Sequence, residues 1–113
     1  MAQLVPLNTF KTVTANLTTV PTILYTTPSE IATIILMAQV TNVGNSVANV
    51  TFTHASNTGL NTELVKGFEV PPNDAASVLT GKLVVEQLCS VRGFASSNAN
   101  LKIVMSLLET SLQ

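Results

Sequence analysis

The sequence predicts an all-β protein, a single antiparallel β-sandwich of jelly-roll-like or immunoglobulin-like type with about eight strands. Three observations lead to this prediction. Thr, Val and Ile, which favour strands, recur along the whole chain. Several segments alternate between apolar and polar residues, and turn-forming residues return about every ten positions. The 113 residues fit one domain, 1–113, in which 1–8 is a candidate docking arm.

The strand-forming segments are separated by turns built from Gly, Pro, Asn, Asp and Ser. In chain order they cover 7–15, 18–27, 31–43, 47–55, 62–68, 75–79, 82–91 (with its strand at 83–85), 92–96 and 101–108. Segment 7–15 alternates, with Phe10 and Thr12 on one side and Lys11 and Val13 on the other. Pro21 lacks a backbone N–H, which favours an edge or a bulge in the second strand.

Segment 31–43 is the most apolar part of the chain and fits either a strand buried on both faces or a helix. Its many β-branched residues favour the strand. Segment 47–55 alternates cleanly, and the Pro-Pro-Asn-Asp sequence at 71–74 predicts a firm turn. Segment 75–79 fits a short strand or one helical turn. A bend is possible at Gly93, and 109–113 is expected to be a short polar tail.

The chain is unusually poor in charge. Charged residues make up 10% of the sequence, against about 25% in an ordinary globular protein. The net charge is −1 and the five cations are scattered, so we expect no nucleic-acid partner. Thr, Asn and Ser faces can be buried against a neighbour without the desolvation cost of Lys or Glu, which favours a subunit of an assembly. The alternative is that these faces are the solvated side of the sandwich.

No residue pattern predicts an enzyme. His54 is the only histidine and shares its strand face with Val50 and Phe52, so we expect it at the rim of the core. The six acidic residues are separated along the chain and are expected to be solvated, and Asp74 is read as a turn residue. The single Cys89 is expected to be a buried, inert thiol. We therefore predict no catalytic residue, no metal and no cofactor.

The aromatic residues are few. Four are Phe, which we expect in the core, and the fifth is Tyr25, the one ring suited to stacking on a sugar. The start of the chain has neither the basic nor the apolar region of a signal peptide. The longest apolar stretch, 31–40, is too short to span a bilayer. We expect a chain made in the cytoplasm, with no membrane partner.

Most of the chain from about residue 17 onward resembles a family of small virion structural proteins of tailed phages, of the marine and cyanobacterial (cyanophage) type. The resemblance is carried by residues 20–29 (VPTILYTTPS), 34–43 (IILMAQVTNV), 48–54 (ANVTFTH), 64–86 (LVKGFEVPPNDAASVLTGKLVVE) and 104–109 (VMSLLE). The family has a Gly-Asp turn where this chain has Gln87 and Leu88. That turn is either rebuilt here or replaced by one long strand running through Cys89.

The resemblance implies a non-enzymatic virion protein, in the first place a capsid decoration or cement protein that binds the shell. A tail, neck or baseplate component is the alternative, and a receptor- or carbohydrate-binding module is another. The expected partners are the major capsid protein or tail and baseplate subunits, together with further copies of the chain, for which a trimer is a candidate arrangement. The candidate contact residues lie in the N-terminal segment and in two loops: Leu4, Val5, Pro6, Leu7, Asn45, Ser46, Asn57 and Thr58.

Overall fold

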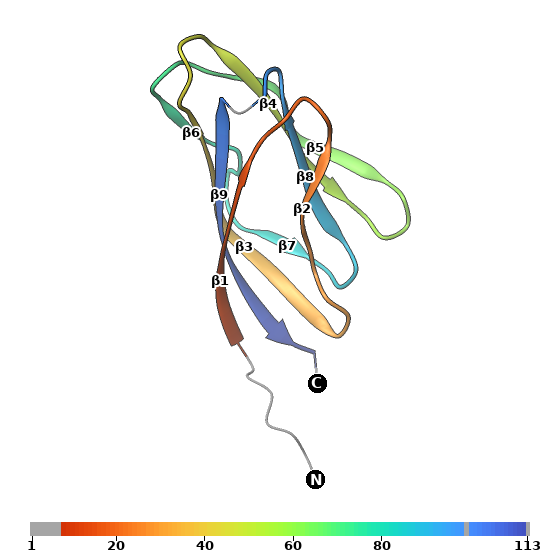
Figure 1. Ribbon diagram of the computed structural model, residues 1–113. Coiled ribbons are helices and arrows are strands. Elements are labelled where there is room, and N and C mark those ends of the chain that lie inside the picture. Colours follow the sequence, from red (N-terminus) through yellow and green to blue (C-terminus); the bar gives the residue numbers. More distant parts are fainter. Residues whose placement is uncertain (1–7, 99, 113) are drawn as a thin grey trace.

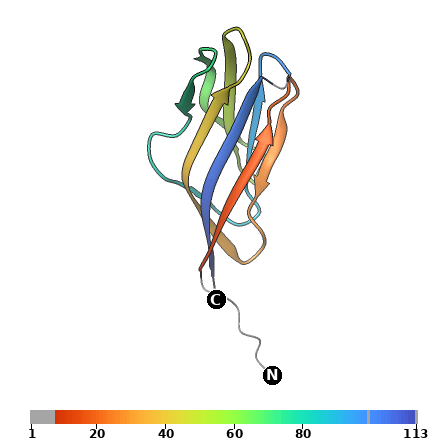
Figure 2. The ribbon, with the colours of Figure 1, turned by 60° about the vertical axis from the view of Figure 1, so that its left-hand side comes forward.

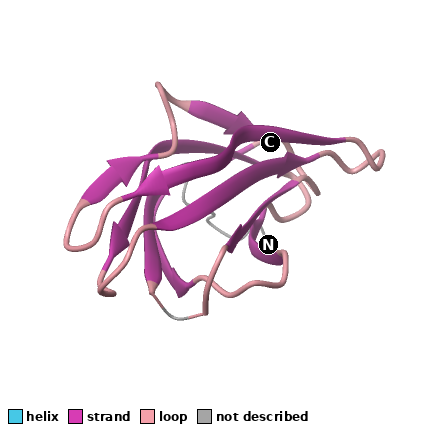
Figure 3. Cartoon of the chain, turned by 90° about the horizontal axis from the view of Figure 1, so that it is seen from above, coloured by secondary structure: helices cyan, strands magenta, loops and turns pink. Residues whose placement is uncertain are grey.

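The computed structural model describes residues 8–98 and 100–112, and it confirms the all-β prediction. These residues form nine strands and no helix (Figure 3). The strands are β1 (Asn8–Asn16), β2 (Thr22–Thr26), β3 (Ile31–Asn42), β4 (Ala48–Ala55), β5 (Asn61–Val70), β6 (Ala75–Ser77), β7 (Leu83–Val85), β8 (Ser90–Ala95) and β9 (Leu101–Ser111). Among the described residues no helix is long and apolar enough to cross a membrane.

The strands form two antiparallel sheets that pack face to face (Figures 1 and 2). One sheet has the order β1-β9-β3-β6, and β7 also pairs with β3. The other has the order β2-β8-β4-β5. Strands β6 and β7 pair with the two ends of the same side of β3, so nine segments fill eight positions. This order is that of a jelly roll, which decides between the two sandwich types that the sequence left open.

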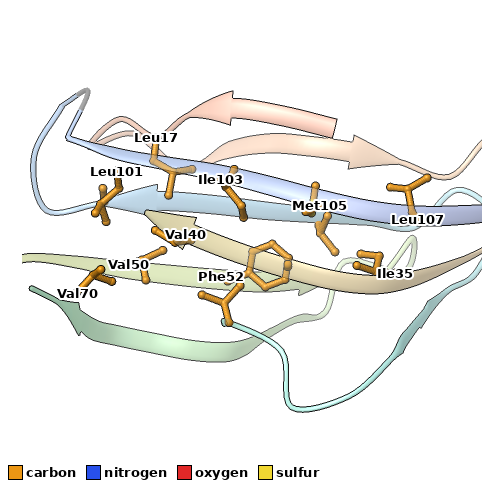
Figure 4. Close-up of a cluster of buried hydrophobic side chains, with 14 of the residues drawn as sticks. Leu17, Ile35, Val40, Val50, Phe52, Val70, Leu101, Ile103, Met105 and Leu107 are labelled. Carbon is orange, nitrogen blue, oxygen red and sulfur yellow. The ribbon is translucent and has the colours of Figure 1, made fainter. Parts of the chain in front are cut away.

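The core lies between the sheets and is built by alternation along the strands. In β9 every second residue from Leu101 to Leu107 is buried, and these side chains face Phe52 and Val50 of the opposite sheet (Figure 4). Phe52 is the largest fully buried side chain. Burying a side chain of this size contributes about 2–3 kcal/mol.

The apolar sequence of β3 does not reflect burial on both faces. A bulge in the middle of the strand changes which alternate residues point into the core. Its pairing with β9 shifts between Ile35 and Met37, which leaves one extra residue in β3. Before the shift Thr33 and Ile35 are buried, and after it Ala38 is buried while Met37 is exposed. The prediction of a strand is confirmed, and the prediction that both faces are buried is wrong.

The segment from 82 to 96 also differs from the expectation in detail. A turn follows β7, with Leu88 in the left-handed region at φ 66°, so the chain does not run through Cys89 as one long strand. Gly93 lies inside β8 instead of at a bend. A Cβ atom there would lie 3.0 Å from Leu24 Cδ1, so glycine lets the neighbouring strand pack closely. Segment 75–79 contains the short strand β6, not a helical turn.

Candidate interaction face

The outer faces of the two sheets differ in charge. Strand β5 carries three charged side chains, and β8 carries Arg92. The outward positions of β1, β9 and β3, all of which the structure describes, carry one charged residue, Lys102. The other charged residues of these strands, Lys11 and Glu109, belong to inward rows. The strands of the five-stranded sheet therefore carry one charge on their outer face, and Glu86, just past β7, lies at its edge with Val84 and Ala32.

An apolar row crosses this face. Strand register aligns Phe10 of β1 with Leu108 of β9, then Ile34 of β3 and Val84 of β7. Residues paired across antiparallel strands place their side chains on the same face. Phe10 is 75% exposed and Val84 is 57% exposed, while the two central residues are half-buried between them. We call these four residues the apolar row.

Uncharged polar residues fill most of the rest of the face. The next two rows contain hydroxyls, an amide and two further apolar side chains: Thr12, Ser106 and Met37, then Thr14, Val104, Gln39 and Ser77. Lys102 lies beyond them, in a row with Asn16 and Thr41. A face that combines exposed apolar groups with few charges has the composition of an interface core.

A partly buried polar cluster lies at the end of the sandwich where this face carries its apolar row. The Tyr25 hydroxyl of β2 donates a hydrogen bond to the Glu109 carboxylate of β9. The same hydroxyl lies 3.0 Å from Thr33 Oγ1, and Glu109 Oε1 lies 3.2 Å from Lys11 Nζ. These four residues, which we call the polar clamp, connect the two sheets. Burial, together with the bond to Glu109, raises the pKa of Tyr25 to about 12.

The sequence analysis missed this cluster because it placed Glu109 in a solvated tail. Strand β9 continues to Ser111, and Glu109 is only 8% exposed. The signal was present, since Leu101, Ile103, Met105, Leu107 and Glu109 share one parity. A carboxylate that continues a buried apolar row requires a partner inside the protein.

The four predicted contact residues that the structure describes lie in two separate loops. Asn45 and Ser46 are exposed in the loop before β4, and Asn57 and Thr58 are exposed in the loop after it. The two loops thus lie at opposite ends of β4. Leu4, Val5, Pro6 and Leu7 fall outside the described residues. Their roles as contacts stay predictions.

The residues weighed for chemistry are placed as follows. His54 is half-buried, in register with Val91 and Thr62. Cys89 is buried, as expected, with its thiol free. Asp74 Oδ1 accepts a hydrogen bond from the Ala75 N–H, as a turn residue does. No group of three or more His, Cys, Asp or Glu that suits a metal ion occurs among the described residues.

The aromatic residues correct one expectation. Phe52 lies in the core, but Phe10 and Phe68 are exposed, at 75% and 43%. The prediction that the Phe residues belong to the core is therefore wrong for these two. Tyr25 is half-buried and its hydroxyl is engaged with Glu109, so it does not offer the free ring that a sugar platform needs.

No family model and no curated protein matches the sequence. Several solved structures share the fold, and three of them are described below. A chain of Bacillus endospore appendages, described as disulfide-linked pili, is 14% identical with a TM-score of 0.56, over 94% of this chain and 88% of that chain. A capsid chain of Helicobacter pylori bacteriophage KHP30 is 9% identical with a TM-score of 0.55, over 96% and 90%. A chain of an infectious bursal disease virus (IBDV) particle is 9% identical with a TM-score of 0.54, over 94% of this chain and 31% of that one.

Proposed function

We propose that the protein is a non-enzymatic structural subunit of a virus particle, and specifically a capsid decoration or cement protein of a tailed phage. The observation that carries this proposal is the charge-poor outer face of the five-stranded sheet, with its exposed apolar row. A freely diffusing protein gains solubility from surface charge, and a subunit that stays docked does not need it there.

The fold supports the same proposal. Jelly rolls are common in viral capsid domains, and two of the three structures above come from virus particles. The third comes from a pilus, which is also an assembly of subunits. The sequence resemblance to tailed-phage virion proteins supports a phage as the source of the particle. Its marine and cyanobacterial form supports a cyanobacterium as the host.

A rigid jelly roll suits a cementing role. The polar clamp and the interlocked sheets hold the contact face in one conformation, so little conformational entropy is lost on docking. The N-terminal segment, with Leu4, Val5, Pro6 and Leu7, is proposed as an arm that reaches a shell subunit. The loop residues Asn45, Ser46, Asn57 and Thr58 are proposed as secondary contacts.

Reconstitution on phage particles that lack the protein tests this proposal. Purified protein is added to the particles, free protein is removed by sedimentation, and bound copies are counted by quantitative mass spectrometry. A decoration protein saturates at hundreds of copies, since the shell repeats its sites many times. Saturation at tens of copies or fewer would assign the protein to the tail, neck or baseplate instead, and no binding to any particle component would refute a virion role.

A variant with residues 2–7 replaced by Gly and Ser tests the arm. We expect its occupancy on the particle to fall while its circular dichroism stays that of the wild type. Full occupancy of this variant would refute the arm and leave the virion role standing.

A further inference from the structure

We infer that the apolar row is the contact for a second copy of this chain, in a two-fold symmetric dimer that places Phe10 against the partner's Val84. This inference deepens the proposed function, because both assign the charge-poor face to assembly. It names the partner that covers the face. It also replaces the possible trimer of the sequence analysis with a dimer.

The order of the four side chains in the apolar row allows it to pair with the same row of a second copy. Its four side chains lie on four neighbouring strands, in the order β1, β9, β3 and β7. A two-fold axis in the plane of the interface, parallel to the strands and between β9 and β3, reverses that order across the contact. Phe10 then meets the partner's Val84, and Leu108 meets the partner's Ile34. Each contact occurs twice, as a self-complementary interface requires.

The position of Lys102, the one outward charge on these strands, supports this axis over the alternative. Lys102 lies at the opposite end of β9 from Leu108. An axis across the middle of the strands would place the apolar row against the row that contains Lys102, which would bury a charge against apolar groups. With the axis parallel to the strands, apolar groups meet apolar groups. Lys102 then lies over uncharged Thr41 of the partner subunit.

The size of the face is sufficient for a modest dimer. Four strands at a spacing of about 4.8 Å, over a strand of nine residues at about 3.3 Å each, cover a footprint of about 570 Å². Counted on both copies, this gives about 1,100 Å². Specific interfaces begin at about 1,000 Å² in total.

Analytical ultracentrifugation of purified protein tests the pairing without any particle. We expect the wild type to sediment as a concentration-dependent dimer. Phe10→Lys alone and Val84→Glu alone each bury a charge against an apolar partner, and each should raise the dissociation constant about 100-fold. In the double variant each new Lys faces a new Glu of the partner, so the dimer should return. Ile23→Glu is the matched control, because Ile23 is 53% exposed and lies on β2 of the other sheet, in register with Arg92.

Each result decides the inference. A wild type that stays monomeric at every concentration overturns it, and so do single variants that dimerise normally. Single variants that become monomeric without rescue in the double variant overturn the pairing of Phe10 with the partner's Val84. If removal of residues 2–7 alone abolishes the dimer, that segment is the occupant of the row and the inference is wrong. Particle binding by the wild type is measured separately, so the two proposals can fail independently.

Lys102 offers a gain-of-function test of the same geometry. The axis brings the two Lys102 side chains of a dimer near one another, which is the one repulsion between like charges on the face. Lys102→Gln should therefore tighten the dimer and weaken its dependence on salt. A looser dimer in this variant would contradict the proposed axis.

Discussion

The hydroxyl of Tyr25 in β2 donates to the carboxylate of Glu109 in β9, and this one contact joins the two sheets of the sandwich through a buried polar group. Lys11 holds the other carboxylate oxygen at 3.2 Å. One oxygen of this inward carboxylate is thus paired with an ammonium group, and the other accepts a hydrogen bond. Its partners come from β1 and β2. The packing of these two strands near the apolar row therefore depends on Glu109.

Replacing Tyr25 with Phe tests the energetic role of this contact. The variant keeps the ring but leaves the buried Glu109 oxygen without its donor, so we expect a loss of about 1–3 kcal/mol in the free energy of unfolding. Urea denaturation measures the loss. Glu109→Gln is the companion variant, because its amide oxygen still accepts from Tyr25, and it should cost less. Equal stability of Tyr25→Phe and wild type would show that the clamp contributes nothing.

The same hydroxyl predicts a pH dependence at the alkaline end. The pKa of Tyr25 rises from 10.0 to about 12 in the folded protein, first because of burial and then because of the bond to Glu109. The folded state holds this proton more tightly than the unfolded state. The stability from this group is therefore complete below pH 10 and is lost as the pH rises from 10 through about 12.

This titration can be observed directly, because the chain has one Tyr and no Trp. The ultraviolet absorbance of tyrosinate therefore reports Tyr25 alone. Protein unfolded in guanidinium is the reference and should titrate near 10. A folded protein that titrates at the same pH as the unfolded reference would contradict the buried hydrogen bond.

Leu88 predicts a difference in stability between two substitutions. It adopts φ 66° although it carries a Cβ, and its side chain is 55% exposed. The left-handed region costs a residue with a Cβ about 1 kcal/mol or more relative to Gly. Leu88→Gly should therefore be more stable than Leu88→Ala by about 1 kcal/mol in thermal or urea unfolding. The Ala variant is the matched control, since it loses the same side chain and keeps the strain, and equal stability of the two would refute the strain.

Replacing Asn42, at the other end of the sandwich, should cause a large loss of stability. Its fully buried amide donates to the carbonyls of Ser46 and Val70, at 2.9 and 2.8 Å, and accepts from the Gly44 N–H at 2.8 Å. Asn42→Ala leaves these groups without partners and should destabilise the protein by about 2–4 kcal/mol. Asn45→Ala, exposed in the same loop, should change stability by less than about 0.5 kcal/mol. Similar effects of the two variants would show that the Asn42 bonds are not needed.

Much of the fold was predictable because local patterns are strong. The segments 31–43 and 47–55 were placed within one residue of β3 and β4, since dense β-branched residues and alternation identify strands without tertiary information. The turn before β8 was not decided, because no glycine marks the left-handed position that Leu88 occupies. Bulges such as that in β3 depend on a partner strand far away in the sequence.

The interaction face was not predicted, although the composition indicated an assembly subunit. The apolar row joins residues of four strands, and its alignment depends on pairings such as that of Ile34 with Val84. A single sequence does not reveal such a register. Phe10 was therefore assigned to the core by its residue type, whereas its position in an outward row of β1 leaves it exposed.

The central claim is that the charge-poor face of the five-stranded sheet is buried in an assembly, and a density map of the native particle tests it most directly. The account predicts that Phe10 and Val84 lie at a subunit contact wherever this domain occurs. A map in which this face is open to solvent, and the contacts are made by the charged strands β5 and β8, would contradict it.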